Sequence, residues 1–128
     1  MKFKIYQTQL STQEFLQLLV EQFPAVKDDV LDEDYEGLIT LQVKFFTKYA
    51  NNCISAGRLD EVRRVFEFFE AVLGKVNSDI NNALHVTFLK RLDLDDDNVN
   101  AREARKLIKP EHLSIFRELG KWSNKPLS

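Results

Sequence analysis

The sequence is poor in cysteine, proline and glycine, with one, three and four copies among its 128 residues. The single Cys53 cannot form an intramolecular disulfide, as is usual for proteins of reducing compartments. It lies in an apolar helical pattern, so we expect a buried structural thiol. With so few residues that interrupt regular structure, long elements joined by short turns are predicted.

Long hydrophobic runs are also missing. No apolar stretch approaches the roughly 18 residues that a membrane-spanning helix needs. The first residues, MKFKIYQTQL, have neither the apolar stretch nor the small-residue cleavage site of a secretory signal. The sequence therefore predicts a cytoplasmic protein with no membrane association.

The usual residues of catalytic and metal sites are scarce. There are two histidines, His85 and His112, and neither belongs to an H-E-x-x-H motif. One cysteine and two separated histidines do not assemble a nucleophile and its base, and the isolated glycines form no phosphate-binding loop. We therefore expect no catalytic residue, no cofactor, no metal ion and no enzymatic activity.

Helical periodicity dominates what is present. Apolar residues recur at spacings of three and four, and Ser11 with Glu14 forms a capping box at the first helix. Phe68 lies off the main apolar stripe of its helix and is predicted to be core, whereas His112 is predicted to be exposed. The predicted helices cover about residues 11–23, 24–31, 38–56, 59–74, 78–92, 98–108 and 110–120, the last ending at Gly120.

Short connections between these helices favour antiparallel neighbours. The prediction is an all-α fold: a compact stack of antiparallel helical hairpins with six or seven helices, as a bundle or a short HEAT-like arrangement. We expect a single domain over residues 1–128. Residues 1–10 form an extended N-terminal segment in this prediction, and residues 123–128 a mobile tail.

The turn at 93–98 partly matches a calcium-binding loop. Asp93, Asp95 and Asp97 occupy the first, third and fifth positions of an EF-hand, but Asn98 replaces the glycine of the sixth. Ala104 stands where the bidentate glutamate belongs. We interpret the turn as solvated, with Asp97 or Asn98 capping the next helix.

Acidic residues are concentrated in two segments. Residues 28–36 hold six acids and residues 93–97 hold four, half of the chain's 20, so the remainder has a surplus of basic residues. In an up-and-down arrangement the two segments lie at opposite ends. The basic stretch 102–109 lacks interleaved aromatic residues and is interpreted as a solvated face, so nucleic acid is not an expected partner.

Three segments together resemble a known family. They read EQFPAVKDDV, RRVFEFFEAVLGKVNSDINNALHVTFLKRL and KLIKPEHLSIFREL. Over about residues 11–119 the chain resembles a family of small, mostly uncharacterised bacterial helical proteins that typically contain "EFPELKE", "IFDFIEEL" and a closing "LGP". Here KLIKP departs from the glycine-containing close. Proteins of this style resemble immunity proteins encoded beside bacterial toxins, including those of contact-dependent growth inhibition.

That resemblance implies an immunity protein that neutralises a cognate toxin, and the acid clustering points to a basic nuclease domain as the partner. The alternatives are a helical adaptor or regulatory protein, which would form a homodimer if its N-terminal segments pair, and an RNA-associated protein that uses residues 102–109. The expected contact residues are Asp28, Asp29, Asp32, Glu33, Asp34 and Tyr35, with Asp95, Asp96 and Asp97 as second choice.

Overall fold

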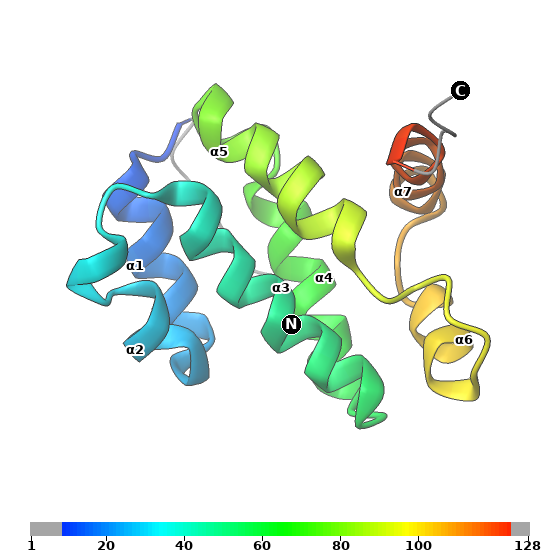
Figure 1. Ribbon diagram of the computed structural model, residues 1–128. Coiled ribbons are helices and arrows are strands. Elements are labelled where there is room, and N and C mark those ends of the chain that lie inside the picture. Colours follow the sequence, from blue (N-terminus) through cyan, green and yellow to red (C-terminus); the bar gives the residue numbers. More distant parts are fainter. Residues whose placement is uncertain (1–8, 124–128) are drawn as a thin grey trace.

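A computed structural model describes residues 9–123, in which all regular structure is helical apart from one isolated β-bridge. Seven α-helices lie in this range, as predicted, joined by short 3₁₀ and π segments (Figure 1). The order is α1 (Thr12–Gln22), η1 (Pro24–Val26), α2 (Lys27–Val30), η2 (Glu33–Tyr35), α3 (Ile39–Ser55), α4 (Leu59–Val72), α5 (Ser78–Ala83), η3 (Leu84–Phe88), η4 (Leu89–Arg91), α6 (Val99–Arg105) and α7 (Pro110–Ser123). Among the described helices, none is long and apolar enough to cross a membrane.

The N-terminal helices form as the sequence predicts. The Ser11 hydroxyl accepts from the Glu14 amide, and the Glu14 carboxylate accepts from the Ser11 amide, which completes the capping box of α1. Pro24 ends α1 and opens η1, where its missing N–H costs no hydrogen bond. Val26 and Val30 are buried and hold the short α2 against the body.

Helix α3 is the centre of the fold. It packs against α2, α4, α5, η3 and α6, and α4 runs back beside α3 in the antiparallel sense that short turns predict (Figure 1). Val43 and Phe46 lie on the buried face of α3. A second apolar face is partly open to solvent, because Leu41 and the N-cap residue Leu38 are exposed.

Aromatic rings fill the contact between these layers. Phe68 is fully buried, as predicted, and its ring centroid lies 6.3 Å from Phe15, 5.5 Å from Phe23 and 5.7 Å from Phe46. Phe46 also stacks on Phe88 at 4.8 Å. Edge and offset contacts of this kind add to the apolar burial and join α1, α3, α4 and η3 into one core.

The predicted helix over 78–92 forms, but with a π segment at its centre. The wider turn in η3 leaves the Thr87 carbonyl available, and the Thr47 hydroxyl of α3 donates to it at 3.0 Å. Asn51 of α3 donates to the Arg91 carbonyl at 3.0 Å and accepts from the Asp93 amide at 2.9 Å. Polar side chains of α3 thus stabilise an irregular helix end.

The C-terminal helices pack beside the ends of α3 and α4. Asn98 caps α6 through the Ala101 amide, one of the two caps that the sequence predicts. Asn100 donates to the Ser55 carbonyl of α3, and a Cβ on Gly57 would lie 3.2 Å from the Asn100 side chain. The prediction that Gly120 ends the last helix is wrong: α7 continues to Ser123, since one glycine weakens a helix without stopping it.

Backbone contacts of Leu10 attach the start of the described chain to the segment before α5. The Leu10 amide donates to the Lys75 carbonyl at 2.6 Å, and Leu10 forms an isolated parallel bridge with Val76. Most of the predicted extended segment 1–10, and the predicted mobile tail except for its first residue, lie outside the described residues.

Candidate functional site

The acidic segment, residues 28–36, forms a ridge on the surface at one end of the helical stack (Figure 1). Val30 anchors it in the core, while Asp32 accepts from the Asp34 amide at 2.9 Å and caps η2. All six acids of the segment are exposed: Asp28, Asp29, Asp32, Glu33, Asp34 and Glu36. Two short helical turns, rather than a flexible loop, therefore hold this charge in place.

Tyr35, one of the expected contact residues, already packs against another residue of the protein. Its ring lies 5.1 Å from Phe45 of α3 and is half-buried. Next to it, Leu31, Leu38 and Leu41 are exposed to 44, 49 and 38%. The acidic segment therefore borders an apolar surface, a combination common where proteins bind other proteins.

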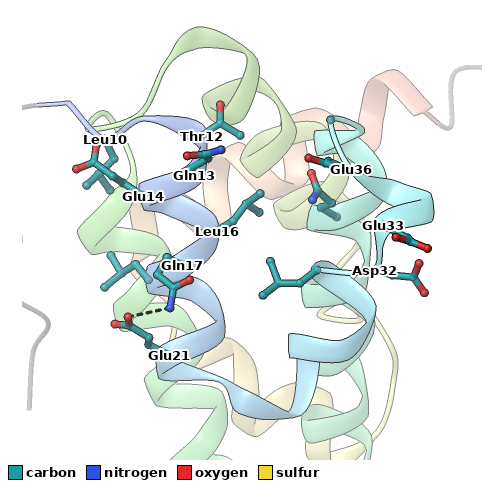
Figure 2. A pocket seen from close by; sticks show the side chains of 14 residues that line it. Leu10, Thr12, Gln13, Glu14, Leu16, Gln17, Glu21, Asp32, Glu33 and Glu36 are labelled. Atoms are coloured by element: carbon teal, nitrogen blue, oxygen red, sulfur yellow. Dashed lines mark hydrogen bonds between the residues drawn. The ribbon is translucent and has the colours of Figure 1, made fainter.

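A cleft of about 1060 Å³ opens between α1 and the segment that leads from α2 into α3. Figure 2 shows Leu16 reaching from α1 toward the opposite wall, with Asp32 and Glu33 at the outer edge of that wall. Of the 14 described residues that line the cleft, five are acidic and none is basic. The acidic residues are Glu14, Glu21, Asp32, Glu33 and Glu36.

Gln42 lies in the wall of this cleft and is only 3% exposed. Its Nε2 donates to the Val30 carbonyl at 3.0 Å, which fixes the amide so that Oε1 is the remaining acceptor. Oε1 is buried and has no hydrogen-bond partner. A buried acceptor without a partner is unfavourable, and natural proteins keep few of them. Sequence reasoning missed both the cleft and Gln42.

The second acidic segment, residues 93–97, lies at the other end of the molecule between η4 and α6, as expected (Figure 1). Asp97 forms an ion pair with Arg102 at 3.2 Å, and Arg105 donates to the Leu94 and Asp96 carbonyls. Burial, with a smaller contribution from Asp96, raises the pKa of Asp93. Asp95, Asp96 and Asp97 are exposed, but basic side chains of α6 partly neutralise this segment.

The basic residues from 102 to 109 are all engaged by the protein itself. Besides Arg102 and Arg105, Lys106 pairs with Glu103 at 3.1 Å, and Lys109 contacts Glu70 of α4. Four cations that already bind acceptors within the chain form a poor surface for a phosphate backbone. This arrangement favours the interpretation of a solvated face.

A cluster of titratable side chains joins α3 to α4. Glu61 accepts hydrogen bonds from Tyr49 and Arg64, and Arg64 also donates to the Gln22 carbonyl at the end of α1. Burial alone would raise the pKa of Glu61, but these two donors and the arginine charge lower it overall. The pKa of Tyr49 is raised, first by burial and then by Glu61. The cluster ties three helices together.

Cys53 is buried, as predicted, and burial raises the pKa of its thiol, so the thiolate that would react is disfavoured. Among the side chains that the structure describes, no group of three or more histidine, cysteine, aspartate or glutamate residues is placed to hold a metal ion.

The two histidines differ from each other in their surroundings. His85 is half-buried and its Nδ1 lies 2.9 Å from the Asn81 carbonyl. The prediction that His112 is exposed is wrong, because α7 turns it onto Phe69 of α4, with the rings 5.1 Å apart. Burial lowers the pKa of His112, a shift that the carboxylates of Glu111 and Glu70 partly oppose.

The fold and surface define an all-helical protein whose most distinctive feature is an acidic ridge beside an acid-rimmed cleft. Residues 16–123 match a family described as a domain of unknown function (DUF7674), and the chain belongs to that family. The match covers every described helix except the first turn of α1. No curated protein and no solved structure shows significant similarity to the chain.

Proposed function

We propose that this protein is a non-catalytic inhibitor that acts in the cytoplasm and binds a basic partner protein through the acidic segment 28–36. The observation that supports this proposal is the ridge of six exposed acids beside a cleft that no basic residue of the described chain lines. Such a surface accelerates the approach of a basic partner. It also opposes association with acidic molecules, including nucleic acids.

The partner that fits best is a toxin whose active site holds a phosphate backbone, so that the protein acts as its immunity protein. Nuclease domains carry basic clefts, and a fixed row of carboxylates presents a similar pattern of negative charge. Val30 in the core and the Asp32 cap hold the acids in one arrangement, which reduces the entropy lost on binding. Exposed Leu31, Leu38 and Leu41 add apolar area at the edge of the ridge.

The adaptor alternative includes a homodimer, and the same surface argues against pairing through this face. A two-fold interface places the same patch of each copy against the other. Six acids would then face six acids, which is unfavourable at short range. A dimer, if one forms, must use another surface.

Co-expression tests the proposal directly. Cells that produce a candidate toxin domain encoded beside this gene should survive when they also produce this protein, and the two chains should co-purify. Asp28→Asn/Asp29→Asn/Asp34→Asn should weaken protection while the protein stays folded, since exposed acids contribute little to stability. Absence of a neighbouring toxin gene, or of any binding, would eliminate the immunity function and leave the adaptor.

A further inference from the structure

The cleft between α1 and the start of α3 has the chemistry of a site for a cation. Among the described residues its lining includes five carboxylates and no basic residue, so the local potential favours positive charge. The carboxylates also differ in their exposure and in the hydrogen bonds that they accept within the protein. Glu14 is held in the capping box and Glu21 accepts from Gln17 at 3.0 Å, whereas Glu33 and Glu36 are exposed at the rim.

Gln42 adds an independent feature to the site, a buried hydrogen-bond acceptor that lacks a donor. Its Oε1 is buried without a partner, although the cleft walls around it are built of ordered helices. An acceptor of this kind is satisfied by a ligand that brings an N–H or O–H donor. The carboxylates disfavour anionic ligands and attract positive charge, so a cationic donor is favoured over a neutral one.

The shape of the cleft selects among cations. Leu16, Leu18 and Leu31 provide apolar surface in the walls, which suits the methylene stem of a long side chain. A guanidinium presents five donors in a fixed planar fork, so one group can reach a buried amide oxygen and a rim carboxylate together. An ammonium has three donors at one point and keeps its water more strongly.

We propose that the cleft binds an arginine side chain of the basic partner, with the guanidinium donating to Gln42 Oε1 and its charge facing the carboxylates of Glu33 and Glu36. The neighbouring exposed Leu31 would contact an apolar residue beside that arginine. This inference rests on the proposed function, because it takes the occupant from a basic protein. It adds the anchoring side chain and the place where it inserts.

The test is an NMR titration of the ¹⁵N-labelled 128-residue protein with the blocked dipeptide acetyl-leucyl-arginine amide. We expect saturable shifts of the Gln42 side-chain amide and the Gly37 backbone amide, since both residues line the cleft. Citrulline in place of arginine keeps the shape and removes the charge. Loss of one charge-assisted hydrogen bond should weaken binding about tenfold.

Variants locate the effect. Glu33→Gln/Glu36→Gln removes two rim charges without touching the core, and Asp95→Asn/Asp96→Asn removes the same charge at the far end of the molecule. Only the first pair should weaken arginine binding. Gln42→Met removes the acceptor and should weaken the binding of both dipeptides, because citrulline also carries N–H donors, whereas Glu33→Gln/Glu36→Gln should reduce the preference for arginine over citrulline. If this variant unfolds because the Val30 carbonyl loses its donor, the rim variants still decide the question.

Three results would overturn the inference: no shift at Gln42, equal affinity for arginine and citrulline dipeptides, or equal loss of affinity in both pairs of variants. Two further outcomes distinguish a failure of this inference from a failure of the proposed function. If the protein binds the arginine dipeptide but no toxin, the cleft is an arginine-binding site and the proposed inhibitor function is wrong. If Glu33→Gln/Glu36→Gln leaves toxin binding unchanged, the cleft is not where the partner's arginine binds. The proposed inhibitor function would still stand.

Discussion

Replacing Phe68 with alanine should cause the largest loss of stability of any single core truncation between α1, α3 and α4. Its side chain is fully buried, so the whole apolar transfer free energy is lost. The three rings around it come from α1, from the C-cap of α1 and from α3, which other contacts fix, so the space left behind cannot close easily. Buried phenylalanine truncations cost about 3–5 kcal/mol, and this site belongs at the upper end.

The assay is urea unfolding followed by far-ultraviolet circular dichroism. Because a domain of this size has a total stability of about 5–15 kcal/mol, Phe68→Ala can leave too little folded protein to measure. Phe68→Leu keeps most of the apolar volume and loses the ring contacts, so it should cost about 1–2 kcal/mol. Half-buried Phe45 is the matched control, and Phe45→Ala should cost about 1 kcal/mol. Equal losses for Phe68→Ala and Phe45→Ala would refute this account of the core.

Two other perturbations test the buried polar groups. Burial lowers the folded-state pKa of His112, so the unfolded chain takes up more protons below about pH 6.5. The free energy of unfolding should therefore fall as the pH drops from 7 to 5, and His112→Phe should flatten that fall; parallel profiles would contradict the assignment. Glu61→Ala removes the acceptor shared by Tyr49 and Arg64 and should cost about 1–2 kcal/mol, whereas exposed Glu118→Ala should cost under about 0.5 kcal/mol. Thermal or urea unfolding of the two variants should show this difference, and equal losses would mean that the cluster is not structural.

Local signals in the sequence predicted most of the helices. The Ser11–Glu14 capping box, the cap at Asn98 and the periodic apolar residues act over one or two helical turns, so a single sequence reveals them. Phe68 was predicted to be core even though it lies off the main stripe, and the structure confirms it. Gly120 misled the prediction because a glycine with ordinary helical backbone angles looks, in sequence, the same as one that ends a helix.

Features that depend on distant elements were not predictable in this way. Whether His112 faces solvent or Phe69 depends on how α7 is rotated against α4, and nothing near His112 in the sequence fixes that rotation. The cleft is lined by α1, by the segment that leads from α2 into α3, and by Gln42 of α3, so its walls come from elements that only the fold brings together. One signal was available: Gln42 is a polar residue on the buried face of α3, next to Val43 and one turn from Phe46.

The attraction of a basic partner by the acidic segment 28–36 is tested most directly by surface-plasmon kinetics with the toxin domain encoded beside the gene, at low and at physiological salt. Asp28→Asn/Asp29→Asn/Asp34→Asn should slow association about tenfold at low salt, with a smaller difference at higher salt and little change in dissociation. Asp95→Asn/Asp96→Asn/Asp97→Asn, which removes the same charge from the distant segment, should associate nearly as fast as the unmodified protein. Unchanged association for the first variant, or a larger loss for the second, would contradict the claim.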